Sequence, residues 1–223
     1  FRFARYSISP DNRLAAYSYN ETGSFAEYTL KVVELESGKE LDLSIEGVSS
    51  FTWANDNKTL FYTTISKTLR PYRVYRYTIG KDRLGRLVYE ERDGRYNSGV
   101  YKSKTDEFIF ILSRSSTTTE VRMLSADNPE GQFTIFRERQ QGVEYSLNHH
   151  ENGFVVRYKD EENLNGALYL APLVGYQNME NWKSILKHDK KSMIEGYDIY
   201  KDYLAIQLRE NGLIEIEIYN LNS

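Results

Sequence analysis

A repeated pattern of polar turns and apolar strands runs along the whole chain. In each repeat a turn with Asp or Asn precedes an apolar strand, and a loop, a second apolar strand and a glycine follow. The turns recur about every 45 to 50 residues, at Asp11, Asp56, Asp106, Asn152 and Asp202. The second strand recurs at Leu30, Val74, Val121, Leu168 and Ile216, and the glycines are Gly47, Gly94, Gly142 and Gly196. Strand repeats of this length predict an all-β fold, a β-propeller, in which each small sheet stacks on its neighbours.

Each repeat predicts one antiparallel propeller blade. We expect blades over residues 1–47, 48–94, 95–142 and 143–195, and an incomplete fifth blade over 196–223. In the first blade the predicted strands are Phe3–Ser9, Leu14–Asn20, Tyr28–Leu35 and Leu41–Glu46. In the fifth they are Gly196–Tyr200, Tyr203–Leu208 and Leu213–Tyr219. The strand pattern leaves no room for a long helix in residues 1–175, and a short helical turn fits only Gly175–Asn181.

The number of predicted strands is awkward for a closed propeller. Four blades and three further strands do not complete a ring of four to eight whole blades. The chain also starts at Phe1 rather than Met, so we expect a truncated arc of a longer propeller domain. An arc exposes a sheet face and free strand edges, and we therefore expect it to self-associate.

Composition narrows the classes of function. The chain has 223 residues, a formal net charge of -3 and no Cys. A disulfide and a Cys-ligated metal are therefore excluded, and no global positive charge favours nucleic acid. No apolar run has the length of a membrane span, and no signal peptide is visible. The sequence leaves the compartment open between cytoplasm and periplasm.

The sequence contains few residues in patterns that are typical of catalytic sites. It has no Gly-x-Ser-x-Gly motif, the turn that presents a nucleophilic serine, and only three His. His149 and His150 precede a turn and could serve a metal or proton transfer, but no second ligand cluster accompanies them. We therefore interpret them as an exposed or capping pair at a blade turn, and His188 as part of a polar loop. We expect no catalytic, cofactor-binding or metal-binding residue and no cofactor in this chain.

Three other features each allow two interpretations. Asp160, Glu161 and Glu162 could bind Ca²⁺, but their spacing matches no EF-hand loop and favours a solvated loop. The stretch Leu69–Tyr77 interleaves basic and aromatic residues, as RNA-binding sheets do. Strand alternation instead puts its rings between blades and its arginines beside acids at the rim. Trp53 and Trp182 are expected in the core between blades.

Several segments carry a resemblance to a known family. Ser9–Tyr17 resembles the blade opening of prolyl oligopeptidase propellers, although this motif is widespread. More specific are Trp53–Asn57, Thr59–Tyr62, Leu69–Arg76, Leu87–Glu91, Thr118–Arg122 and Glu144–His149. In this order and spacing they resemble the oligopeptidase B (protease II) branch of the prolyl oligopeptidase family. The resemblance runs from near Phe1 to near Leu221.

The resemblance implies a function for the parent protein. Members of that branch are serine peptidases that cleave short peptides after Arg or Lys. They pair a seven-bladed propeller with an α/β-hydrolase domain that carries the Ser-Asp-His triad, and the propeller excludes folded proteins. The catalytic motif is absent from this chain, so the resemblance places no catalytic residue here. It implies as partners the chain's own α/β-hydrolase domain and short peptides, and neither nucleic acid nor a membrane.

Two alternatives remain open at the level of sequence. One is a stand-alone propeller that acts as a protein-interaction scaffold, as many propellers do. The other is the propeller of a prolyl- or dipeptidyl-cleaving relative. The run Leu69–Arg76 favours the oligopeptidase B branch over the second alternative.

Overall fold

The computed structural model describes residues 2–24 and 26–221. These residues form β-strands throughout, with one short 3₁₀-helix, η1 (Met179–Asn181). The expected all-β fold is confirmed, and the single helical turn lies inside the segment Gly175–Asn181 where the sequence allowed one. No helix among the described residues is long and apolar enough to cross a membrane.

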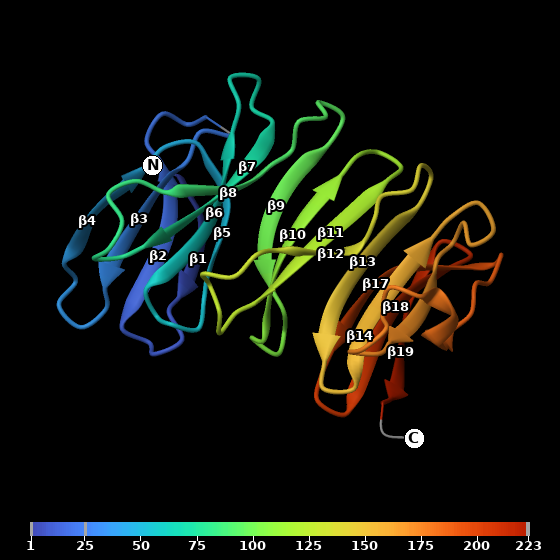
Figure 1. Cartoon of the computed structure of the whole chain (residues 1–223). Helices are drawn as coiled ribbons and strands as arrows, with labels where there is room; N and C mark the ends of the chain where they lie inside the picture. Colours follow the sequence, from blue (N-terminus) through green and yellow to red (C-terminus); the bar gives the residue numbers. More distant parts are fainter. Residues whose placement is uncertain (1, 25, 222–223) are drawn as a thin grey trace. The chain divides into compact units, whose positions relative to one another are not determined.

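The strands form five antiparallel sheets that follow one another along the chain (Figure 1). The first contains β1 (Arg2–Ile8), β2 (Leu14–Asn20), β3 (Thr29–Glu34) and β4 (Glu40–Ile45). The second contains β5 (Val48–Trp53), β6 (Thr59–Ile65), β7 (Pro71–Thr78) and β8 (Arg86–Glu90). The third contains β9 (Asn97–Lys102), β10 (Phe108–Arg114), β11 (Thr119–Ser125) and β12 (Thr134–Arg137).

The last two sheets differ in size. The fourth contains β13 (Glu144–His150), β14 (Gly153–Lys159), β15 (Ala167–Ala171) and β16 (Lys183–Leu186). The fifth contains β17 (Ser192–Ile199), β18 (Tyr203–Glu210) and β19 (Leu213–Asn220). In every sheet the strands are ordered as they occur in the chain, as expected for propeller blades that are joined by short hairpins.

The chain divides into two compact units, and the division passes through the third sheet. The first unit holds Phe1–Lys102, Asp106–Ser115 and Arg122–Thr134. The second holds Ser103–Thr105, Ser116–Val121 and Ile135–Ser223. Each unit has a hydrophobic core of its own.

In the first unit the sheets bury both faces of β6. Leu60 and Tyr62 pack with Leu30 of the first sheet, in a core that also contains Trp53. Phe61 points the opposite way, into a core with residues of the third sheet such as Ile109 and Ile111. A strand covered on both faces needs a continuous apolar run, which explains Leu60–Tyr62.

Trp53 connects the first two sheets by a polar contact as well. Its side chain is 1% exposed, and its Nε1–H donates to the Ser7 carbonyl at 3.0 Å. A buried indole needs such a partner because its N–H has left water. The expected position of Trp53 between blades is confirmed.

The core of the second unit is partly aromatic. Phe136 stacks on Tyr176 with ring centroids 4.8 Å apart and meets Phe154 edge-to-face at 5.3 Å. Trp182 packs beside Phe136 and donates its Nε1–H to the Tyr176 carbonyl. A second cluster joins the fourth and fifth sheets through Val155, Leu168, Ile194, Leu204 and Ile206. Trp182 therefore lies in the core, as expected.

In three of the repeated turns, Asp106 and the asparagines that follow Asp11 and Asp56 have a left-handed backbone conformation. Asn12, Asn57 and Asp106 adopt φ angles of 59°, 62° and 61°, a left-handed conformation that these side chains tolerate better than most. The turns of the first and second sheets are also linked, because Asp11 N–H donates to Asn57 Oδ1 at 2.8 Å. This contact links the first two sheets at their turns.

One predicted strand requires correction. The first strand of the fifth sheet was expected at Gly196–Tyr200, but β17 begins at Ser192. Its pairing with β18 shifts register between Ile194 and Gly196, so Gly196 marks a β-bulge inside the strand rather than a boundary between blades. Ile194 N–H also donates to the Asn165 carbonyl, which joins this strand to the fourth sheet's loop.

Stacking of sheets predicts which leucines stabilise the fold. Leu168 is fully buried between the fourth and fifth sheets, whereas Leu164, four residues away, is 63% exposed. We expect Leu168→Ala to lower the free energy of unfolding by about 2–5 kcal/mol and Leu164→Ala to change it by less than about 0.5 kcal/mol. Urea unfolding of both variants measures the difference, and equal effects would contradict the assignment of this core.

Candidate functional site

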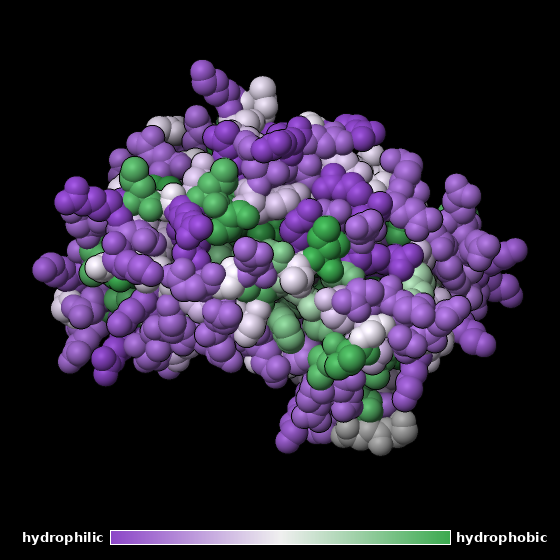
Figure 2. All heavy atoms as spheres, viewed as in Figure 1, coloured by the Kyte–Doolittle hydropathy of each residue, from purple (hydrophilic) through white to green (hydrophobic). Residues whose placement is uncertain are grey.

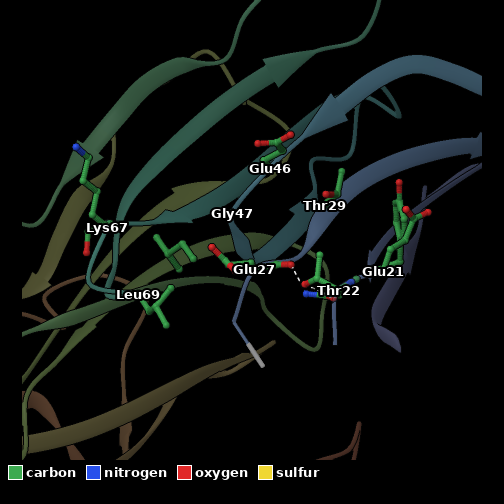
Figure 3. A pocket seen from close by; sticks show the side chains of 12 residues that line it. Glu21, Thr22, Glu27, Thr29, Glu46, Gly47, Lys67 and Leu69 are labelled. Carbon is green, nitrogen blue, oxygen red and sulfur yellow. Dashed lines mark hydrogen bonds between the residues drawn. The ribbon is translucent and has the colours of Figure 1, made fainter. Parts of the chain in front are cut away.

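A hollow opens at one end of the first two sheets. Its volume is about 560 Å³, and it is lined by the β2–β3 loop, the link between β4 and β5, and the β6–β7 loop. Figure 3 shows the side chains around it, among them Glu21, Glu27, Glu46 and Lys67. Three carboxylates against one ammonium give this hollow a local negative charge, which attracts cationic groups.

The β2–β3 loop is held by a single buried amide. Asn20 is 3% exposed, and its Oδ1 accepts hydrogen bonds from the backbone N–H groups of Thr22 and Gly23 at 2.7 and 2.8 Å. Its Nδ2 donates to the Glu27 carbonyl. One side chain thus binds backbone groups near both ends of the loop, beside the hollow.

The β6–β7 loop contains an unusual backbone conformation. Leu69 has φ 61°, although it is neither Gly, Asn nor Asp, and its side chain is 49% exposed. The left-handed region costs an ordinary residue about 1–2 kcal/mol. Ser66 offsets this cost, since its Oγ accepts from the N–H groups of Thr68 and Arg70, and its carbonyl accepts from Leu69 N–H. The loop thus presents an exposed leucine in a fixed position.

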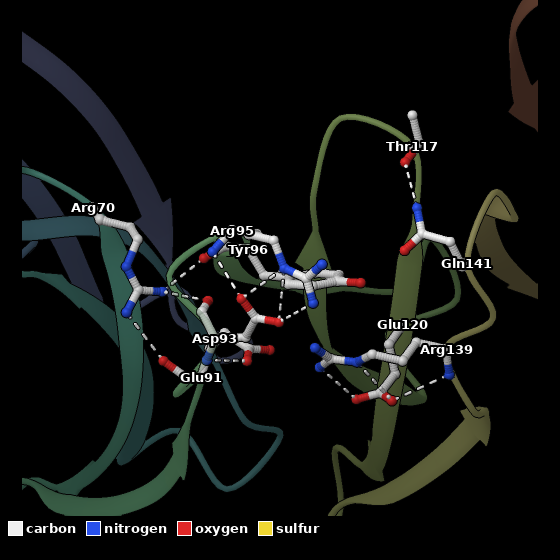
Figure 4. Close-up of polar contacts among 9 residues, drawn as sticks. All are labelled: Arg70, Glu91, Asp93, Arg95, Tyr96, Thr117, Glu120, Arg139 and Gln141. Atoms are coloured by element: carbon white, nitrogen blue, oxygen red, sulfur yellow. Dashed lines mark hydrogen bonds and ion pairs between the residues drawn. The ribbon is translucent and has the colours of Figure 1, made fainter.

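Arg70 anchors the same loop to the segment that follows β8 (Figure 4). Its guanidinium donates to the backbone carbonyls of Tyr96, Glu91 and Asp93 at 2.7, 3.1 and 3.4 Å. Arg95 supports that segment through a forked pair with the Asp93 carboxylate. A guanidinium that binds several carbonyls holds two loops together with strong, directional bonds.

In the second unit, an ion pair and a buried tyrosine hydroxyl connect neighbouring backbone segments. Arg139 pairs with the buried Glu120 at 3.2 Å (Figure 4). The Tyr145 hydroxyl accepts from Val121 N–H and donates to the Arg137 carbonyl, both at 2.8 Å. Burial raises the pKa of Tyr145 above its usual range, so this hydroxyl is neutral and acts as a structural hydrogen-bonding group.

The two histidines before the fourth sheet's first turn are buried. His149 and His150 are 1% and 3% exposed and belong to strand β13. The expectation of an exposed pair is wrong, because the strand continues to the two-residue turn that ends at Gly153. The alternative of capping holds for His150 alone: its Nδ1 accepts from Asn152 N–H, and its Nε2 contacts the Lys201 carbonyl at 2.8 Å.

His149 forms the contact that most resembles a catalytic pair. Its Nδ1 lies 2.7 Å from Thr105 Oγ1, within the reach that a base needs to activate a hydroxyl. With 1% of its surface exposed, the imidazole offers a substrate no access. The contact therefore connects two turns of the second unit.

The other residues that the sequence offered as metal or proton-transfer candidates lie in turns and links between strands. Asp160 Oδ1 accepts from Glu162 N–H and Asn163 N–H, which makes a turn, and Glu161 and Glu162 are exposed. His188 lies in the link between β16 and β17. Among the described residues, no group of three or more His, Asp or Glu is arranged to hold a metal ion.

The basic and aromatic stretch follows the predicted alternation. Tyr75 and Tyr77 pack into the core with the first sheet, and Val74 faces the third. Arg76 lies on the same face as Val74 and pairs with Glu130 at 2.7 Å, and Arg73 pairs with Glu90 at 2.7 Å. Rings buried between sheets cannot form the open stacking platform that RNA recognition needs.

Comparison with known proteins assigns the fold to a family. The model of the prolyl oligopeptidase N-terminal β-propeller domain matches residues 1–223. The chain belongs to this family. It is 30% identical over 216 residues to dipeptidyl aminopeptidase BI of Pseudoxanthomonas mexicana and 28% identical over 213 residues to protease 2 of Moraxella lacunata. These alignments cover 96% and 94% of the chain, and 30% of each relative.

A solved structure agrees with the family assignment. Oligopeptidase B of Leishmania major superposes with a TM-score of 0.90 at 23% identity, over 98% of this chain and 31% of the other. The chain therefore has the prolyl oligopeptidase propeller fold and spans about a third of the length of its relatives. This family of propellers is paired with a catalytic hydrolase domain in serine peptidases.

The left-handed backbone at Leu69 gives a test of the loop. Because glycine adopts positive φ freely, we expect Leu69→Gly to raise the free energy of unfolding by up to about 1 kcal/mol. Leu35→Gly is the control, since Leu35 is similarly exposed and its φ is not positive; it should lower the free energy by about 0.5–1 kcal/mol. Urea unfolding compares the two, and a loss of stability in both would contradict the strain at Leu69.

Proposed function

We propose that this chain is the gating propeller of a serine peptidase that cleaves short peptides after Arg or Lys. The observation that carries the proposal is the match of the propeller family along the entire chain. The likeness to protease 2 supports the oligopeptidase B branch. The glutamates around the hollow of the first unit suit cationic peptides, because a local negative charge raises their concentration nearby.

The propeller contributes selection by size rather than bond cleavage. Tightly packed sheets form a stiff wall, because a core at crystal-like density deforms little. Such a wall beside a catalytic cleft admits a thin peptide chain and excludes a folded protein. The chain lacks the Gly-x-Ser-x-Gly motif, and peptide hydrolysis would take place in the hydrolase domain. In that domain a serine, its base and an oxyanion hole would lower the activation free energy of peptide-bond hydrolysis.

A second candidate is a peptidase that removes dipeptides from a free amino terminus. The 30% identity to dipeptidyl aminopeptidase BI favours it. The two candidates differ in the substrate terminus that the enzyme accepts. An endopeptidase cleaves N-blocked peptides, whereas a dipeptidyl peptidase must bind the free ammonium group.

Chromogenic substrates test the proposed activity. We expect the full-length protein to hydrolyse an N-blocked p-nitroanilide that carries Arg or Lys before the scissile bond. The 223-residue chain alone should hydrolyse nothing, because it lacks the nucleophile motif. Initial rates at 405 nm measure both. Activity only on free-amino dipeptide substrates would establish the second candidate, and activity only after Pro would reject the assignment to Arg or Lys.

Self-association of the isolated chain is proposed from the fifth sheet. Ile214, Ile216 and Ile218 of β19 are 53%, 69% and 62% exposed, and Figure 2 shows some apolar side chains near the C-terminal end of the described chain. A flat apolar strand at a sheet edge favours pairing with another copy. We expect the 223-residue chain to dimerise or form larger species in light scattering, and Ile216→Lys to shift it toward monomer. Leu84→Lys is the control, at an 86% exposed leucine in a hairpin. A monomeric wild-type chain at high concentration would refute this proposal.

A further inference from the structure

A second hollow, in the first unit, has the opposite charge. It has a volume of about 390 Å³ and lies between β8 of the second sheet and the segment that leads into β12 of the third. Its side chains include Arg76, Arg86, Arg122, Glu130, Gln132 and Phe133. We call it the arginine cleft. It is separate from the glutamate-lined hollow and from every residue that the proposed peptidase function uses.

Two of its arginines lie directly opposite each other. Arg76 of β7 pairs in register with Arg86 of β8, and like charges at such positions repel. Arg76 is 6% exposed, whereas Arg86 is exposed and forms no ion pair with any other described residue. Arg122 approaches from the third sheet, with its guanidinium 4.7 Å from the centroid of the Tyr89 ring. Three guanidinium groups therefore converge on one cleft.

The carboxylate of Glu130, which lines the cleft, is shared between two cations. Glu130 pairs with Arg76 Nη2 at 2.7 Å and with Lys81 Nζ at 2.9 Å. Among the described residues that line the cleft, the charged side chains are those of Arg76, Arg86, Arg122 and Glu130. A local positive excess in a chain of net charge -3 indicates attraction of an anionic ligand.

The hydrogen-bond donors of the Arg76 guanidinium also point to an anionic ligand. Its Nη1 donates to the Pro129 carbonyl at 3.0 Å and its Nη2 pairs with Glu130. Its Nε is buried and has no hydrogen-bond partner among the described residues. Buried donors are almost always satisfied, so this side chain is incompletely compensated within the described structure.

The shape of the cleft favours an extended peptide over a small ion. β8 is the last strand of its sheet, and so one of its edges carries unpaired N–H and C=O groups. Four consecutive residues of β8, from Arg86 to Tyr89, line the cleft. Leu87, Val88 and Phe133 add apolar surface between the charges. An added strand gains main-chain hydrogen bonds at such an edge, and its alternate side chains meet the pockets beside it.

We propose that the arginine cleft binds an extended acidic segment of another protein, which adds as a strand to the edge of β8 and places a carboxylate near Arg86. Carboxylates suit guanidinium groups because the planar fork donates two parallel hydrogen bonds. The inference does not depend on the peptidase function, because the cleft shares no residue with it.

Binding of a defined peptide to the full-length protein tests the proposal. The probe is a fluorescein-labelled octapeptide of alternating valine and glutamate, and its counterpart has lysine in place of glutamate. Fluorescence anisotropy should detect the glutamate peptide and not the lysine peptide. We expect binding to weaken by about tenfold or more between 50 and 500 mM NaCl, because the charge pairs are screened. An active-site inhibitor is included so that hydrolysis of the probe does not affect the reading.

Charge reversal locates the site. We expect Arg86→Glu to weaken binding by about tenfold or more, and Arg92→Glu by less than about twofold. Arg92 is a matched control because it is 88% exposed, follows the same strand and lies outside the cleft. Bound peptide should also slow deuterium exchange of the amides of residues 86–90, which an ion pair alone would not do.

Three outcomes would overturn the proposal. The first is no binding of the glutamate peptide at about 1 mM, where even weak complexes are detected. The second is equal weakening by Arg86→Glu and Arg92→Glu, which would show non-specific attraction. The third is complete displacement of the peptide by inorganic phosphate at equal concentration without protection of residues 86–90, which would make the cleft a small-anion site. Both variants should keep the wild-type unfolding midpoint, because both side chains are exposed.

Discussion

Burial of sheet faces against neighbouring sheets is the interaction on which the rest of the structure depends. No single sheet of four short strands can cover both of its faces, and a free sheet of this size is marginal in water. In the first unit Leu60 and Phe61, adjacent in β6, enter two different cores. Stability therefore accumulates between neighbouring sheets, as in other repeat proteins. The loops at the sheet ends can then vary in sequence and charge without loss of the core.

Much of this arrangement could be predicted from the sequence because the repeated positions obey strong local rules. Asp and Asn tolerate the left-handed turn, and apolar residues recur where strands are covered. The strand β2, at Leu14–Asn20, has the predicted bounds. The blade boundary predicted at Gly196 was wrong, because a glycine can occupy a β-bulge within a strand as well as a turn between blades. His149 and His150 misled it for a related reason, because polar residues near a turn can still belong to a buried strand end.

The candidate sites were harder to predict because they depend on residues that are distant in sequence. The carbonyls that receive Arg70 lie more than twenty residues away, and a carbonyl has no signature in a sequence. Leu69 carries no signal of its positive φ, since leucine ordinarily avoids that region. The arginine cleft depends on the register of β7 against β8 and on the approach of the third sheet. By contrast, the pairing of Arg76 with an acid was accessible from strand alternation alone.

The way in which Arg70 holds its neighbours has an evolutionary consequence. Its guanidinium binds main-chain oxygens rather than the side chains of Glu91, Asp93 and Tyr96. Every amino acid supplies such an oxygen, so substitutions at those three positions leave the acceptors in place as long as the backbone path persists. Substitution of the arginine itself removes all three bonds at once. Selection on this contact therefore acts on the Arg70 codon rather than on four codons. The side chains of the segment that follows β8 can then vary while the β6–β7 loop keeps its anchor.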